Sequence, residues 1–204
     1  MSYIKFFLKK KALQIKSNLF IKSKPGSCDS YPYKWNRIKK YANDFNAKIF
    51  VETGTYYGVT IDKMIPYFES IYSIEIDQSL YTYNSMFYKN NSAVKLKLGD
   101  SKFILPEILS TIKKDSDNFP VIFWLDGHYS GHETGIGDDY SPICSELKTI
   151  TTLQKIKSII IIDDLRLFDG KDYPTLDEVI SSLPLNQYRV IEDQDALVLI
   201  DNSL

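Results

Sequence analysis

The spacing of apolar positions along the chain changes repeatedly between two periods, which predicts strands and helices in alternation. Short β-rich apolar runs stand between stretches whose apolar residues recur three or four positions apart. The expected strands cover residues 48–52, 71–76, 93–98, 120–125, 158–162, 188–192 and 196–200. The expected helices cover residues 35–44, 61–68, 79–89, 102–112, 141–154 and 174–182.

This order of elements predicts an α/β fold. Right-handed crossovers place the strands in a doubly wound, mostly parallel sheet of seven strands with helices on both faces. The last two strands are joined by a short polar link, so we expect them to form a C-terminal antiparallel hairpin. The run at 158–162 is apolar throughout and is expected to be buried on both faces.

Composition narrows the class of protein. The chain has 204 residues, of which 44% are hydrophobic and 25% charged, as expected for one globular domain. A net charge of −1 argues against a nucleic-acid partner. The two cysteines, Cys28 and Cys144, offer no disulfide framework and fit a reducing compartment. No apolar stretch reaches the length of a membrane span, so we predict a cytoplasmic protein.

The N-terminus differs in charge from the rest. Residues 1–24 contain seven lysines and no acid, so a basic helical extension and lead-in is expected over 1–45, ahead of a main domain at 46–204. As a helix, this segment would place Ile4, Phe7, Leu8 and Ile15 on one side. It is a candidate for peripheral contact with the inner face of an anionic membrane. The alternative is a solvated helix packed on the body, and homo-oligomer formation is also left open.

Acidic residues lie at or just after the ends of the expected strands and suggest a binding site. They are Glu52, Glu75, Asp100 in a Gly-Asp pair, Asp126, and the pair Asp163 and Asp164. The carboxyl ends of parallel strands meet at one edge of a sheet, where ligands bind in open α/β folds. We therefore expect these acids to converge.

A glycine turn follows the first of these strands. Glu52, Gly54 and Gly58 form an E-x-G-x-x-x-G pattern between strand and helix. Such glycines let the backbone approach a ligand closely, with free N–H groups at the helix start. Glu75, about 20 residues further on, is placed to accept both hydroxyls of a ribose. The layout is typical of a nucleoside-binding unit.

The motifs at 48–164 together resemble the class I S-adenosylmethionine-dependent methyltransferases. The segment E-T-G-T-Y-Y-G-V-T at 52–60 is similar to the first motif of the metal-dependent O-methyltransferases, of the catechol, caffeoyl-coenzyme-A and macrocin types. Tyr56 stands where the generic motif has a glycine, which matches that branch. The resemblance implies that these residues bind S-adenosylmethionine: Glu52, Gly54, Thr55, Tyr56, Gly58, Thr60, Glu75, Asp100, Ser101 and Asp126.

The same resemblance implies a metal site. Asp126, Asp163 and Asp164 stand at the positions where the family holds its metal, and carboxylate oxygens suit Mg²⁺ or another divalent cation. A cation on the acceptor oxygen lowers the pKa of the acceptor hydroxyl. Catechol-type members place a basic lysine where this chain has Tyr129, so we expect His128 or Asp126 to be the catalytic base.

The predicted function is therefore transfer of a methyl group to a hydroxyl of a small molecule, sugar or surface glycan. The [DN]-P-P-[YF] signature of nucleic-acid amino-methyltransferases is absent, since Asp126 is followed by Gly127-His128-Tyr129. Two alternatives remain open: a catalytically silent cofactor-binding scaffold, and a metal-dependent hydrolase or phosphoryl-transfer enzyme. The H-x-x-x-H spacing of His128 and His132 also leaves a zinc site open, without an evident third ligand.

Overall fold

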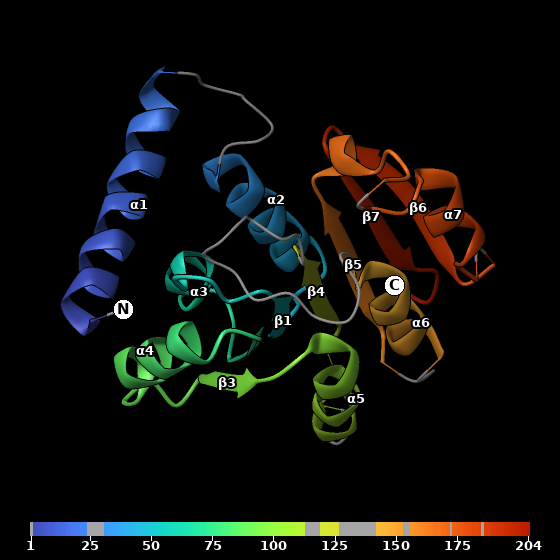
Figure 1. Ribbon diagram of the computed structural model, residues 1–204. Coiled ribbons are helices and arrows are strands. Elements are labelled where there is room, and N and C mark those ends of the chain that lie inside the picture. The colour runs from blue at the N-terminus through green and yellow to red at the C-terminus, as the bar shows by residue number, and fades with distance from the viewer. Residues whose placement is uncertain are drawn as a thin grey trace.

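The protein is an α/β sandwich built on one mixed sheet of seven strands (Figure 1). The computed structural model describes residues 2–23, 31–112, 119–126, 142–152, 156–171, 173–184 and 186–204. The strands are β1 Ile49–Thr53, β2 Ser70–Glu75, β3 Val94–Leu98, β4 Val121–Leu125, β5 Ser158–Asp163, β6 Tyr188–Asp193 and β7 Ala196–Asp201.

The sheet order is β3-β2-β1-β4-β5-β7-β6. Strands β1 to β5 pair in parallel, and β7 pairs antiparallel with both β5 and β6. The order changes direction between β1 and β4, the kind of switch point at which doubly wound sheets bind ligands. The predicted doubly wound sheet and its C-terminal antiparallel hairpin are confirmed.

Helices cover both faces of the sheet. One face carries α1 Tyr3–Ser23, α2 Tyr31–Asp44, α3 Val59–Met64 and α4 Gln78–Tyr88; the other carries α5 Ser101–Ile112, α6 Ile143–Thr152 and α7 Leu176–Ser181. Side chains alternate between faces along a strand. Phe50 of β1 therefore packs in the hydrophobic cluster under α1 to α4, and Val51 packs in the cluster under α5 to α7. Every residue of β5 is buried, as predicted for that run.

The two largest differences from the predicted helix bounds are at the start of α2 and the end of α3, and proline accounts for both. Helix α2 begins at Tyr31 rather than near residue 35, because Pro32 is tolerated in a first turn, where its missing N–H has no helical partner. Helix α3 ends at Met64 rather than Phe68, because Pro66 cannot donate the next helical hydrogen bond. The expected loop at 127–140 lies outside the described residues.

Helix α1 packs on the body through one face. Phe6 and Lys10 of this face are buried against α3 and α4, and Phe6 stacks on Tyr57 with ring centroids 5.2 Å apart. In the parts of the chain that the structure describes, no helix combines the length and apolar content needed to cross a bilayer. The division into 1–45 and 46–204 stays a prediction.

Candidate active site

The glycine turn after β1 lies directly beside the end of β4. Gly54 has a φ of 97° and Gly58 a φ of 67°, values in the left-handed region that favour glycine. The N–H groups of Gly54 and Thr55 donate to the carbonyl oxygen of Ile74 at 3.0 and 3.1 Å. A Cβ on Gly54 would lie 3.1 Å from the carbonyl oxygen of Asp126, so glycine is what lets the two strand ends approach.

Tyr56 also has a left-handed backbone, with a φ of 50°. This conformation costs an L side chain on the order of 1 kcal/mol, which explains why a glycine is the generic residue at this position. Two hydrogen bonds hold Tyr56 there: its N–H donates to Glu75 Oε2 at 2.7 Å, and its carbonyl accepts from Asn84 Nδ2 at 2.6 Å. The side chains around the turn therefore maintain the shape that glycine would adopt freely.

Glu75 lies at the end of β2, facing the turn. Its second oxygen, Oε1, accepts from the N–H of Asp77 at 2.9 Å. Burial raises the pKa of Glu75 to about 7, while the hydrogen bonds from Asp77 and Tyr56 act to lower it. Each carboxylate oxygen has two lone pairs, so one on each remains available to a ribose hydroxyl.

Glu52 lies beneath the turn rather than at its surface. Only 1% of this residue is exposed, and Oε1 accepts from Ser73 Oγ at 2.7 Å. Ser73 in turn shares a 2.5 Å hydrogen bond with the hydroxyl of Thr55. Burial raises the pKa of Glu52 to about 8, against the effect of the Ser73 hydrogen bond. This position supports the turn from below; contact with a cofactor stays a prediction.

The remaining predicted cofactor residues border the same edge. Asp100 caps α5, because its Oδ1 accepts from the N–H of Lys102 at 2.9 Å, and Ser101 is buried at the helix start. Thr60 lies in the first turn of α3 and accepts from Trp35 Nε1 at 3.4 Å. The structure therefore brings the three sequence motifs together at the carboxyl ends of β1, β2 and β3.

Lys10 of α1 also supports the turn and was not anticipated from sequence. Its Nζ donates to the carbonyl oxygens of Tyr57 at 2.7 Å and Gly58 at 3.1 Å, and to the hydroxyl of Tyr88 at 2.7 Å. It also pairs with Asp62 Oδ2 at 2.9 Å. Burial lowers the pKa of Lys10, and Asp62 acts to raise it. Seven lysines in 1–24 gave no indication of which one is buried.

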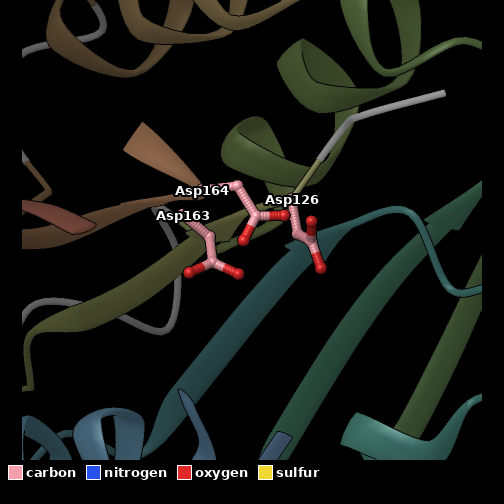
Figure 2. A group of neighbouring side chains, drawn as sticks. All are labelled: Asp126, Asp163 and Asp164. Atoms are coloured by element: carbon pink, nitrogen blue, oxygen red, sulfur yellow. The ribbon is translucent and has the colours of Figure 1, made fainter. Parts of the chain in front are cut away.

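Asp126, Asp163 and Asp164 form an acidic cluster at the ends of β4 and β5. One oxygen from each carboxylate lies within 4.8 Å of the others, and Figure 2 shows the three carboxylate groups next to one another. Asp163 and Asp164 are almost fully buried. Asp164 precedes the 3-10 turn Leu165–Leu167, but its side chain makes no capping hydrogen bond to that turn. Its carboxylate is instead part of the acidic cluster.

Three cations of the chain surround this cluster, and sequence analysis missed them. Lys34 of α2 pairs with Asp163 and, at 2.5 Å, with Asp164 Oδ1. Arg37 Nη1 lies 3.7 Å from Asp163 Oδ1, and Arg166 Nη1 lies 2.8 Å from Asp164 Oδ1. The only sequence signal was the spacing of Lys34 and Arg37, which share one side of a helix.

The pKa values follow from this crowding of charge. Burial acts to lower the pKa of Lys34, but Asp126, Asp163 and Asp164 raise it well above its ordinary value. Burial and Asp126 raise the pKa of Asp163 above its usual range, with Lys34 opposing them. In this pair the pKa of Lys34 is the one that is raised by its partner's charge, because three carboxylates act on one ammonium. Lys34 therefore carries its charge at neutral pH.

Glu146 is a further buried acid that sequence analysis did not identify. It lies in the first turn of α6, fully buried, close to the hydroxyls of Thr53 and Ser101. Neither hydroxyl reaches hydrogen-bonding geometry, so within the described residues both carboxylate oxygens lack a hydrogen-bond partner. Burial raises the pKa of Glu146 to about 7. The predicted catalytic His128, with Tyr129 and His132, lies outside the described residues.

The fold of this chain, which gathers the glycine turn, Glu75 and the acidic cluster along one edge, is similar to that of O-methyltransferases of known structure. A Bacillus cereus O-methyltransferase in complex with S-adenosylhomocysteine has a TM-score of 0.60 at 12% identity, covering 94% of this chain and 91% of that one. A Staphylococcus aureus protein assigned as a caffeoyl-CoA O-methyltransferase has a TM-score of 0.56 at 14% identity, covering 96% and 100%.

A third similar structure belongs to a methyltransferase named for transfer to nitrogen rather than to oxygen. The N-methyltransferase NodS from Bradyrhizobium japonicum WM9 has a TM-score of 0.52 at 11% identity, covering 81% of this chain and 90% of that one. No protein-family model matches the sequence, and neither does any curated protein. At these identities the likeness establishes the fold and leaves the reaction and the acceptor open.

Proposed function

We propose that the protein is an S-adenosylmethionine-dependent O-methyltransferase acting on a hydroxyl of a small molecule, sugar or surface glycan. The observation that carries this proposal is the contact between Gly54 and Asp126, whose carbonyl oxygen lies 3.1 Å from where a Cβ of residue 54 would be. Because of this contact the glycine turn, which would hold the donor, lies beside the acidic cluster. A transfer enzyme requires this closeness, because donor and acceptor have to be aligned for in-line displacement.

The residues along the edge divide into donor and acceptor sides. On the donor side the backbone of the glycine turn, which a side chain at Gly54 or Gly58 would crowd, would hold S-adenosylmethionine together with Glu75 and the Asp100-Ser101 pair. When bound, this group supplies a methyl on a positively charged sulfur, which an acceptor oxygen attacks. On the acceptor side Asp126 lies nearest the turn, and it or His128 would accept the proton of the hydroxyl.

The predicted Mg²⁺ concerns the acceptor side alone. Asp126, Asp163 and Asp164 form a suitable set of oxygen donors, and a bound cation would lower the pKa of the acceptor hydroxyl. Lys34, however, pairs with two of the three carboxylates. The residues present therefore fit a divalent cation only if Lys34 withdraws from them.

Calorimetric titration with S-adenosylhomocysteine tests the donor side. We expect saturable binding by the full chain and affinity at least about tenfold weaker in Glu75→Ala, a loss of about 1.4 kcal/mol. The matched control is Glu107→Ala, at an exposed glutamate of α5, which should bind as the natural chain does. Absence of binding by the natural chain would overturn the proposal and favour the metal-dependent hydrolase. Binding without turnover across a panel of hydroxyl acceptors would favour the silent scaffold.

Peripheral membrane contact is a separate part of the proposal, supported by the outward face of α1. Ile4, Leu8 and Ile15 are 71, 60 and 58% exposed, and the lysines at 5 and 16 are also exposed. Apolar side chains flanked by lysines suit an anionic bilayer surface. Deleting the helix would also remove Phe6 and Lys10 from the turn, so substitutions on the outward face make a cleaner test.

Co-sedimentation with phosphatidylserine-containing vesicles measures this contact. The variant Ile4→Ser/Leu8→Ser/Ile15→Ser should bind at least about tenfold more weakly than the natural chain. Phe103→Ser, at a residue of α5 that is 61% exposed, is the control and should not change binding. If the natural chain does not sediment with these vesicles, α1 has no membrane role.

A further inference from the structure

Side chains of the chain itself already bring positive charge to the acidic cluster. Lys34 pairs with both Asp163 and Asp164, as described above. Arg37 and Arg166 also reach the cluster, but each is shared with a further carboxylate, Asp193 and Asp195 respectively. A divalent cation at the same carboxylates would stand beside the buried ammonium of Lys34, where the interior screens the repulsion poorly.

Lys34 and a divalent cation would also compete for the same space. Magnesium requires carboxylate oxygens at about 2.0–2.1 Å and calcium at about 2.3–2.6 Å. The Nζ atom of Lys34 already lies 2.5 Å from Asp164 Oδ1 and is paired with Asp163. Both carboxylates are members of the predicted metal set, so the ammonium stands among the atoms that a metal would bind.

The helix that carries Lys34 is held firmly in place. Its neighbour Trp35 and the next turn's Ile38 are buried in the hydrophobic cluster of this face. Arg37 donates from Nη2 to the carbonyl oxygen of Asp193 at 2.8 Å and from Nε to Asp193 Oδ2 at 3.2 Å. Lys34 itself is only 7% exposed. Withdrawal of its ammonium would break a buried ion pair and leave Asp163 and Asp164 without their nearest cation.

We propose that Lys34 is the resident cation of the acidic cluster and excludes a divalent cation from it. An ammonium is a compact positive charge with three hydrogen-bond donors, so it is able to hold and polarise an acceptor oxygen as a positioned donor. This last step rests on the proposed function; the exclusion of the metal rests on the cluster alone. The ammonium of Lys34 therefore takes the place that was predicted for Mg²⁺.

Binding of Mn²⁺, followed by electron paramagnetic resonance of the free ion, tests the exclusion without relying on activity. We expect no saturable site in the natural chain up to about 1 mM Mn²⁺. Lys34→Met removes the ammonium and should create one site per chain, with a dissociation constant lower by at least about tenfold. Adding Asp163→Asn to Lys34→Met should abolish that site. Lys40→Met, at an exposed lysine of the same helix, should behave as the natural chain does.

Two outcomes would overturn the proposal. One is a saturable Mn²⁺ site in the natural chain that disappears in Asp163→Asn, because the ammonium would then fail to exclude the metal. The other is no gain of binding in a folded Lys34→Met chain. Lys34→Gln replaces Lys34→Met if thermal unfolding shows that the latter is not folded. Titration with S-adenosylhomocysteine, run in parallel, reports on the proposed function and is independent of the Mn²⁺ result.

Discussion

The two N-terminal helices each insert one buried lysine into the edge of the sheet, and the two lysines have opposite electrostatic surroundings. Lys10 of α1 meets two carbonyl oxygens, a phenol and one carboxylate, and its pKa is lowered by burial. Lys34 of α2 pairs with the carboxylates of Asp163 and Asp164, and these charges and that of Asp126 raise its pKa in spite of burial. The comparison teaches that two similarly buried lysines have different roles because their partners differ. Lys10 binds backbone carbonyls and fixes the shape of a turn, whereas Lys34 neutralises buried carboxylates.

The largest effect is expected from removing the charge of Lys34. Lys34→Met leaves Asp163 and Asp164 buried without their nearest cation, so the free energy of unfolding should fall by about 3–5 kcal/mol. Urea unfolding at pH 7 measures the change. Lys40→Met should alter stability by less than about 1 kcal/mol, because its pair with Asp44 is exposed. Equal effects of the two substitutions would show that Lys34 is not a counter-charge.

A smaller effect on stability, which depends on pH, is expected from Glu52. Glu52 has a folded pKa of about 8 against an ordinary value of 4.5. Its contribution to stability is fully present below pH 4.5 and is lost as the pH rises through 8, since the unfolded chain ionises first. Between pH 5 and pH 8 this loss amounts to about 3 kcal/mol.

Glu52→Gln removes this dependence while keeping an oxygen for Ser73 to donate to. The variant should therefore unfold at higher temperature than the natural chain at pH 8, with the difference shrinking toward pH 5. Thermal unfolding across this range measures it, and Glu107→Gln, at an exposed acid, serves as the control. A difference between variant and natural chain that stays constant with pH would contradict the raised pKa.

The smallest of these effects is expected from Lys10. Lys10→Met leaves the carbonyls of Tyr57 and Gly58 with fewer donors, at a cost of about 2 kcal/mol. Because those carbonyls belong to the glycine turn, which we propose binds the donor, affinity for S-adenosylhomocysteine should fall as well. Lys16→Met, at an exposed lysine of the same helix, should change neither quantity. If Lys10→Met lowers stability without weakening this affinity, the turn keeps its shape without Lys10.

Sequence patterns predicted the sheet because strand identity is a local property. A run such as that at 158–162 has to be buried wherever it lies, and the alternation of strands with helices then restricts the topology. The residues that follow the strands, including Glu75 and Asp126, were found for the same reason. Helix boundaries at Tyr31 and Met64 differed because two prolines act through local rules that apolar spacing does not reveal.

Helix residues that reach the carboxyl-end edge of the sheet could not be predicted from strand patterns. Lys10 lies 48 positions before Gly58, and Lys34 lies 130 positions before Asp164. Whether a lysine on a helix is solvated or buried depends on how that helix is rotated against the sheet. For Glu146 the apolar spacing of α6 marked a buried face but gave no reason to place an acid on it.

The long separation between Lys34 and Asp164 also affects how the protein folds. Lys34 leaves the ribosome long before its carboxylates exist, and their contact closes a loop of 130 positions that includes β1 to β5. Contacts of such high sequence separation form slowly, because the entropy of closing the loop has to be offset first. The contacts of Lys34 with Asp163 and Asp164 are therefore among the last to form, and a chain that stops before β5 contains Asp126 but lacks both of these carboxylates.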